Sequence, residues 1–221
     1  PSTMGQLLGA YAELLVDDLP WIVTAFDHLN RNPLGSASGF GVPLPLDRAR
    51  VAELLRFEAV QLNSIAVQND RGKTEHLVLT ACSAPALDLA RLATELIWLS
   101  SDEFRLVSFD PSVTTGSSIM PQKQNPDALE LIRGTGSRLR ARIIEISSIT
   151  GALTSGYHRD LQLTKEPFLE GLTSARDVLV VMRRVLESME IDVERCRALL
   201  EPDIASTDAM CQKIEAGVPM R

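Results

Sequence analysis

Two long helical patterns flank the polar stretch 114–126, whose sequence is Thr114-Thr115-Gly116-Ser117-Ser118-Ile119-Met120-Pro121-Gln122-Lys123-Gln124-Asn125-Pro126. A polar segment of this kind between apolar helices is typical of a functional loop on a rigid scaffold. The flexible backbone at Gly116 and the hydroxyl and N–H groups beside it suit an oxyanion, and Lys123 adds a positive charge. Asn125 before Pro126 predicts an N-cap and the first residue of a helix, where anions are favoured. The stretch therefore predicts a site for an anionic substrate.

Apolar residues recur at helical spacing over most of the chain outside this stretch. The long runs cover residues 7–29, about 74–101, 128–149 and 168–189. Pro85 predicts a bend, and Pro20 predicts either a kink or the start of a second helix. Gly134 and Gly136 weaken the third run by roughly 1 kcal/mol each relative to alanine, a cost that often marks close helix contact. No alternating strand pattern of useful length is present in the sequence, so we predict an all-α fold.

Shorter helices are predicted between and after these runs. Asp47 predicts the N-cap of one helix, with Val51, Leu54 and Leu55 facing inward. Asp192 predicts the N-cap of another, which ends near Leu200. Residues 68–73 are predicted to form a polar turn.

Residues 1–190 are predicted to form a central bundle, and residues 191–221 the start of a small C-terminal helical domain. A helix of about 25 residues is near 37 Å long, so the short elements of this chain leave its apolar face uncovered. Other copies of the chain are the expected cover. Because the chain begins at Pro1 and stops in an expected helix-ending turn at 216–221, we expect an interior piece of a longer polypeptide.

Composition limits the class of protein. The 221 residues are 45% hydrophobic and only 5% aromatic, so Leu, Ala, Ile and Val must fill the core, which suits helix packing. A net charge of −7 argues against a general nucleic-acid binder but allows a local cationic pocket. No uninterrupted apolar span reaches the roughly 20 residues of a transmembrane helix, and no signal peptide is recognised. We therefore expect a cytoplasmic protein without a nucleic-acid or membrane partner.

Cysteines and histidines do not predict a metal site. Three cysteines are an odd number without paired metal spacing, which indicates free thiols in a reducing compartment. The three histidines are too scattered for a zinc ligand set. These residues are Cys82, Cys196, Cys211, His28, His76 and His158.

Two motifs resemble a known enzyme superfamily. The pattern Gly-Ser-Ser-x-Met-Pro-x-Lys-x-Asn-Pro at 116–126 resembles the signature loop of the fumarase/aspartase superfamily. A second block at 157–165, Tyr157-His158-Arg159-Asp160-Leu161-Gln162-Leu163-Thr164-Lys165, is similar to the Tyr-x-Lys/Arg-Asp-Leu-Gln-x-Asp-Lys of the argininosuccinate lyase branch. The resemblance implies a long-helix bundle formed by a homotetramer, with each site drawn from three chains and no cofactor.

The implied reaction splits a C–N bond of argininosuccinate to leave arginine and fumarate, a step in arginine biosynthesis. A base removes a proton beside a carboxylate, and charge builds as an aci-carboxylate before the amine departs. Ser117 matches the proton-abstracting residue, which needs activation by its surroundings. Lys123 matches a carboxylate-binding position, and Glu130 matches a residue that pairs with a catalytic histidine of another segment. Thr115 and Ser118 are weaker candidates for carboxylate contacts.

Further positions match substrate-binding residues. Tyr157, Gln162 and Lys165 match residues that hold the arginine part, and a spacing of three would place Gln162 and Lys165 on one helix face. Asn125 is expected either to contact a substrate carboxylate or to cap the helix. Thr164 departs from the usual acidic residue, which puts the substrate in more doubt than the lyase chemistry. Arg71 resembles an arginine near the site, although its neighbours are atypical.

Several alternatives stay open at this point. Ser117 could be a turn hydroxyl, Lys123 a solvated lysine and Glu130 a helix-surface carboxylate. The whole chain could belong to a sister lyase acting on another succinyl-amine or on a fumarate-type substrate, to a non-catalytic crystallin-like scaffold, or to an inert helical assembly module. In the superfamily the acid histidine precedes the equivalent of Pro1, so we expect that these 221 residues alone lack a full catalytic set.

Overall fold

The structure is a computed structural model that describes residues 2–120, 123–200 and 202–217. Pro121 and Gln122 of the signature stretch lie outside the described residues. So do Pro1 and residues 218–221 at the ends of the chain.

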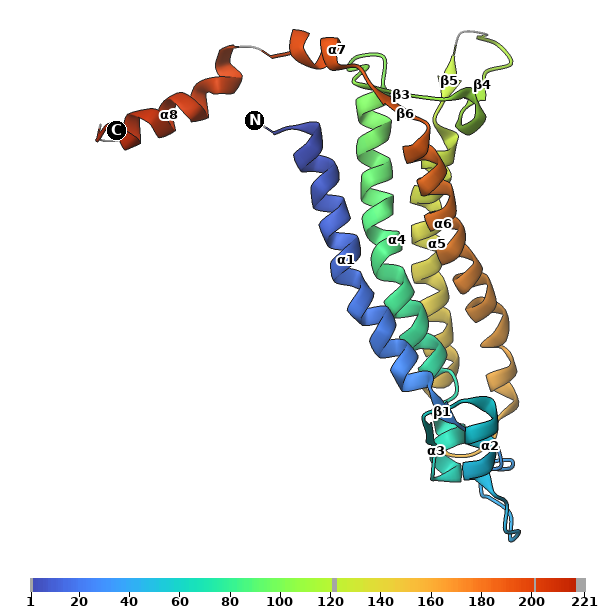
Figure 1. Ribbon diagram of the computed structural model, residues 1–221. Coiled ribbons are helices and arrows are strands. Elements are labelled where there is room, and N and C mark those ends of the chain that lie inside the picture. The colour runs from blue at the N-terminus through green and yellow to red at the C-terminus, as the bar shows by residue number, and fades with distance from the viewer. Residues whose placement is uncertain (1, 121–122, 201, 218–221) are drawn as a thin grey trace.

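Four long helices lie side by side along most of the molecule (Figure 1). They are α1 (Met4–Leu29), α4 (Lys73–Ser100), α5 (Asp127–Thr150) and α6 (Lys165–Glu187). The predicted all-α fold is therefore confirmed. Pro20 and Pro85 lie inside α1 and α4 without ending either helix, so the alternative of a second helix after Pro20 is wrong.

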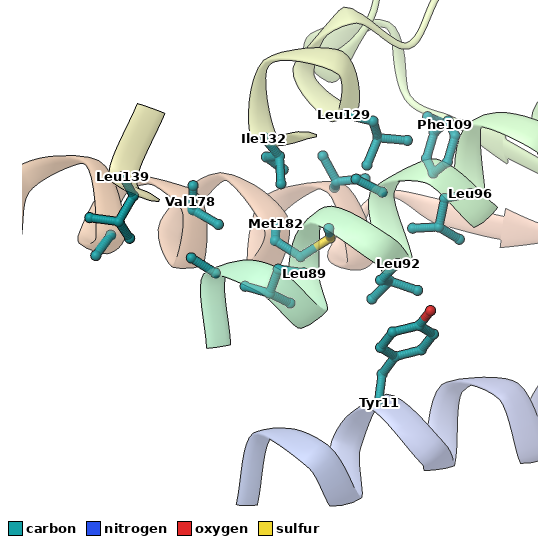
Figure 2. Packing of buried hydrophobic residues seen from close by; sticks show 14 of the residues in the cluster. Tyr11, Leu89, Leu92, Leu96, Phe109, Leu129, Ile132, Leu139, Val178 and Met182 are labelled. Carbon is teal, nitrogen blue, oxygen red and sulfur yellow. The ribbon is translucent and has the colours of Figure 1, made fainter. Parts of the chain in front are cut away.

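The core runs along α4, which packs against α1, α5 and α6. Figure 2 shows the apolar side chains of α4, α5 and α6 pointing toward one another, with Tyr11 approaching from α1. Burial of each such side chain contributes roughly 1.5–3 kcal/mol. The largest fully buried apolar side chains of the bundle are Leu79, Leu92, Leu96, Leu129, Leu139, Ile146, Met182 and Val185.

Two helix glycines allow the bundle to pack closely. A Cβ added at Gly136 of α5 would lie 3.3 Å from the Ala90 side chain of α4, and one added at Gly171 of α6 would lie 2.8 Å from Leu79. Gly134 was predicted to mark a close contact too, but among the described residues nothing lies within 4 Å of an added Cβ there. That prediction is wrong because Gly134 lies on the exposed face of α5.

α4 is long and apolar enough to cross a membrane by length and composition alone. Eight of its residues are buried in the bundle, although Leu87 and Trp98 stay exposed, so packing accounts for much of its apolar composition.

Short elements close one end of the bundle. The strands β1 (Arg31–Asn32) and β2 (Ala59–Val60) pair in parallel, and α2 (Arg48–Leu55) and α3 (Ser64–Asn69) pack around them. Arg48 holds this end together by donating to the carbonyl oxygens of four residues. The acceptors are Pro33 at 3.5 Å, Leu34 at 2.8 Å, Gln61 at 2.6 Å and Leu62 at 3.0 Å.

The predicted cap of α2 is confirmed, since the Asp47 carboxylate accepts from the Arg50 N–H at 2.8 Å. The prediction that Leu54 and Leu55 face inward is wrong, since both are more than half exposed. The residue that α2 buries is the smaller Ala52.

The opposite end carries two short antiparallel ribbons. The strands β3 (Val107–Phe109) and β6 (Met189–Ile191) form one, and β4 (Thr115–Gly116) and β5 (Gln124–Asn125) form the other. The 3₁₀ turn η1 (Pro111–Val113) connects them.

The chain after residue 191 leads away from the bundle (Figure 1). It contains α7 (Val193–Ala198), η3 (Pro202–Ala205) and α8 (Ser206–Glu215). The Asp192 carboxylate caps α7 as predicted, accepting from the Arg195 N–H at 2.8 Å. A domain boundary near residue 190 stays a prediction.

Candidate active site

The signature stretch forms a hairpin at the end of the bundle where α5 begins (Figure 1). Thr115 pairs with Asn125 and Gly116 with Gln124, so the two strands hold the residues between them as a closed loop. Inside this loop the Lys123 N–H donates to the Met120 carbonyl at 3.0 Å.

Ser117 directly follows β4 and is half-buried at the base of the loop. Its Oγ accepts hydrogen bonds from the N–H groups of Met120 at 3.1 Å and Ile119 at 3.3 Å. N–H groups aimed at an oxygen stabilise negative charge on it. The hydroxyl thus lies at the surface, in an environment that favours its anionic form.

The other candidate residues of this loop lie around Ser117. Thr115, Ser118, Lys123 and Glu130 are exposed. In the described part of the chain neither Lys123 nor Glu130 forms an ion pair. Both charges therefore remain available to a ligand or to another chain.

Asn125 does not cap α5, so that prediction is wrong. Its pairing with Thr115 keeps it in an extended strand, and the helix begins two residues later at Asp127. Pro126 occupies the N-cap position, and no side chain among the described residues caps the helix with a hydrogen bond. The Asn125 amide is therefore not committed to a cap.

A groove of about 960 Å³ lies at the same end of the bundle. Its described lining comes from β3, η1, β6 and the C-terminal part of α6, and none of the predicted site residues contributes to it. The site residues of the hairpin thus face open surface rather than this groove.

The second block forms a separate cluster at the other end of α5. Tyr157 is 42% exposed, and its phenolic oxygen accepts from the Gln162 side-chain amide at 3.2 Å. The Arg71 guanidinium carbon lies 5.5 Å from the centroid of the Tyr157 ring. Gln162 ends the 3₁₀ turn η2 (Arg159–Gln162), whereas Lys165 begins α6. The prediction that Gln162 and Lys165 share one helix is therefore wrong.

Lys165 and Arg71 also line a pocket of about 610 Å³, together with His28, Arg31 and Asp70. Burial alone would raise the pKa of Asp70. Its hydrogen bond with Lys73 and the nearby positive groups outweigh burial and lower that pKa. The Asp70 carboxylate thus stays charged and partly offsets the positive charges of Arg31, Arg71 and Lys165 in the pocket lining.

Thr164, where the second block departs from the lyase pattern, is buried beneath this cluster. It is 1% exposed, and its hydroxyl donates to the Leu161 carbonyl at 3.0 Å. The side chain at this position therefore supports the loop from inside and presents no group to a ligand.

Within one chain the two motifs lie far apart. The hairpin precedes α5 and the second block follows it, and α5 has 24 residues, or about 36 Å of helix. The fold brings Ser117, Lys123 and Asn125 together at one end, and Tyr157 and Gln162 together at the other. A site that uses both groups must be assembled from more than one chain.

Sequence reasoning undervalued the end of α3 and the turn that follows it. Asn69, the last residue of α3, and Arg71 in the turn contact the second block through their side chains. The available signal was Gly72, because a glycine directly after three polar residues indicates an unusual backbone conformation.

Comparisons with known proteins relate the chain to lyases. A family described as lyase matches residues 1–140. The argininosuccinate lyases of Thermotoga neapolitana and Sorangium cellulosum are 36% and 40% identical over 221 residues. The alignments cover the whole of this chain but only 56% and 51%, respectively, of the lengths of these two relatives.

Solved structures agree as well. The crystal structure of EDDS lyase in complex with formate has a TM-score of 0.78 and 28% identity, covering 84% of this chain and 37% of that one. An EDDS lyase variant with bound fumarate also has a TM-score of 0.78, at 27% identity and the same coverage. The chain spans about half the length of the curated relatives it matches. By its sequence and its helix bundle, the chain belongs to this lyase family of the fumarase/aspartase superfamily.

Proposed function

We propose that this chain is the central part of an enzyme that cleaves a C–N bond of argininosuccinate and releases arginine and fumarate. The observation that carries the proposal is the environment of Ser117, whose hydroxyl oxygen accepts from two backbone N–H groups in an exposed loop. The names of the relatives and the second block support argininosuccinate as the substrate.

Ser117 removes the proton from the carbon beside a substrate carboxylate. A serine is a weak base unless its surroundings stabilise the alkoxide, and the N–H groups of Ile119 and Met120 supply such stabilisation. Electrons from the broken C–H bond move into the carboxylate to give an aci-carboxylate. They return to form the double bond of fumarate as the C–N bond breaks and nitrogen takes the pair.

The groups around Ser117 bind the carboxylates that gain charge in this step. Lys123 supplies a positive charge, and the uncommitted amide of Asn125 supplies a donor. The hydroxyls of Thr115 and Ser118 add weaker donors. Glu130 is exposed in the first turn of α5, where it can orient a histidine contributed by another segment.

Tyr157, Gln162 and Lys165 bind the arginine part of the substrate. Because the Tyr157 oxygen accepts from Gln162, the phenolic hydrogen is free to donate to a ligand. Lys165 is exposed and supplies a positive charge for a carboxylate.

The separation of the two motifs favours a homotetramer with sites shared between chains. α1 exposes several large apolar residues that a single chain leaves in water, among them Trp21 at 66%, Val23 at 56% and Phe26 at 62%. Exposed apolar surface of this extent on a long helix is typical of subunit interfaces.

A second candidate is a sister lyase that acts on another succinyl-amine. The likeness to EDDS lyase favours it, because that enzyme shares the fold at 28% identity. The departure at Thr164 is weaker support than the sequence suggested, since this side chain is buried and faces no ligand. A non-catalytic crystallin-like scaffold is the third possibility, and the intact signature motif around Ser117 argues against it.

The test uses the polypeptide that the gene encodes, at its full length. We expect fumarate release from argininosuccinate, and a loss of at least about 10²-fold in kcat for Ser117→Ala. Ser147→Ala, an exposed serine of α5 that donates to the Ile144 carbonyl, is the matched control. Fumarate release from a different succinyl-amine but not from argininosuccinate would favour the sister lyase. Unchanged turnover in Ser117→Ala would refute the assignment of Ser117 as the base.

A further inference from the structure

The polar turn at 68–72 contacts the second block through Asn69. The Asn69 side chain donates to the Ser155 hydroxyl at 3.0 Å and accepts from the Gly156 N–H at 3.2 Å. One amide thus bonds to both residues that directly precede Tyr157. These two hydrogen bonds fix the backbone conformation directly before Tyr157.

Arg71 of the same turn contacts Tyr157 itself. Its guanidinium lies 5.5 Å from the ring centroid, within the range of a cation–π interaction. Gln162 donates to the phenolic oxygen at 3.2 Å. The ring is therefore held on its face by Arg71 and at its oxygen by Gln162, and both contacts restrict the direction of the hydroxyl.

The turn is fixed from its other side, independently of Tyr157. Gly72 has φ +78°, and an added Cβ would lie 2.1 Å from the Thr150 side chain at the end of α5. Asp70 accepts from Lys73 at 3.2 Å and from Gln61 at 2.8 Å. These contacts therefore hold Asn69 and Arg71 in fixed positions.

We propose that Arg71 is a positioning residue that orients the Tyr157 hydroxyl for the substrate, while Asn69 sets the backbone beneath it. This role rests on the proposed function, because it assumes that Tyr157 contacts the substrate. Without Arg71 the exposed ring keeps its Gln162 hydrogen bond but loses the contact on its face, so the hydroxyl samples more directions.

The first test observes the ring directly and requires no turnover. In the full-length polypeptide labelled with fluorotyrosine, Tyr157→Phe and Tyr11→Phe each remove one fluorine resonance and so assign it. Arg71→Gln is expected to shift the Tyr157 resonance and leave that of Tyr11 in place. Arg176→Gln, an exposed arginine of α6 that pairs with its neighbour Asp177, is expected to move neither.

An unmoved Tyr157 resonance in Arg71→Gln would overturn the proposal. The Tyr11 resonance reports whether the bundle is intact. If Arg71→Gln disturbs both resonances, Arg71→Lys decides the question, because it keeps the positive charge and is expected to give a smaller shift confined to Tyr157. A Lys variant with no shift at Tyr157, or with a shift at Tyr11 alone, contradicts the proposal.

The second test measures turnover of argininosuccinate by the full-length polypeptide. Loss of one exposed cation–π contact predicts a rise of about two- to fivefold in KM for Arg71→Gln, with kcat changed by less than about twofold. Arg71→Lys is expected to restore most of the KM. A loss in kcat of about tenfold at unchanged KM would overturn the positioning role, since Arg71 would then act on the reacting atoms. Absence of turnover in the unaltered protein would instead contradict the proposed function and leave the resonance result standing.

Discussion

Replacing Gly171 by alanine is expected to destabilise the bundle, although alanine is the better helix former. Gly171 lies in α6 and faces Leu79 of α4 and Leu139 of α5. An added Cβ would lie 2.8 and 2.9 Å from the two terminal carbons of Leu79 and 3.4 Å from a terminal carbon of Leu139. Both leucines are at most 1% exposed, so neither side chain has free space into which it can move.

The magnitude follows from two opposing effects. Alanine gains about 1 kcal/mol of helix propensity over glycine, and an extra methyl group in a filled core costs about 1–3 kcal/mol. Gly134→Ala is the matched control, because its added Cβ meets nothing within 4 Å among the described residues and keeps the propensity gain alone. The propensity term cancels between the two variants, so Gly171→Ala should be less stable than Gly134→Ala by about 1–3 kcal/mol.

Thermal unfolding at equal protein concentration measures this difference, since assembly makes Tm depend on concentration. For a chain of this size about 1 kcal/mol corresponds to about 2–4 °C in Tm. We expect Gly134→Ala to melt at or above the unaltered protein and Gly171→Ala below it. A Gly171→Ala variant that melts as high as Gly134→Ala would refute the inferred contact between the three helices.

Three further predictions concern charge and hydrogen bonding. Burial, followed by the Glu95 carboxylate, raises the pKa of Tyr11 to about 12. The stability that the protonated Tyr11 contributes should therefore be full below about pH 10 and fall between about pH 10 and 12. Tyr11→Phe should abolish that fall in alkaline unfolding curves. Burial, followed by the Asp88 charge, raises the pKa of Asp18, so the stability that the protonated carboxyl group contributes is present in acid and lost as pH rises. In urea unfolding, Asp18→Asn should raise the free energy of unfolding near pH 7 by roughly 0.5 kcal/mol and give no gain near pH 3. Arg48→Met removes donors to four backbone carbonyls and should speed amide hydrogen exchange in the loop that Arg48 holds, equivalent to about 2 kcal/mol of local stability. Unchanged exchange would contradict that role.

The helical skeleton was predictable because burial at helical spacing leaves a pattern in the residues themselves. All four long runs are helices, and the caps at Asp47 and Asp192 form as predicted. The errors arose where a contact across space outweighs a local preference. Asn125 is a favourable cap residue, yet its pairing with Thr115 draws it into a strand. Leu54 fits the inward face of a helix, but α2 is only eight residues long and buries Ala52 instead.

The candidate site was predictable as a set of residues but not as an arrangement. Signature-loop residues are close in sequence, and their hairpin needs no information beyond the loop. The contact between Arg71 and Tyr157 joins residues 86 positions apart, and no local pattern encodes it. Its sequence traces are Arg71 itself, which resembles an arginine near the site, and Gly72, whose positive φ lets the turn pass against Thr150.

The length of α5 connects the fold to the proposed function. Its 24 residues place the hairpin and the second block about 36 Å apart, and the neighbouring helices of 28 and 23 residues keep that separation rigid. Two chains that lie side by side without an axial offset and run in the same direction would place like ends together and leave the motifs apart. Chains that run in opposite directions bring the Ser117 end of one copy to the Tyr157 end of another. The bundle therefore favours an antiparallel assembly if both motifs bind one substrate, and the apolar residues that α1 exposes are a surface from which such an assembly can be built.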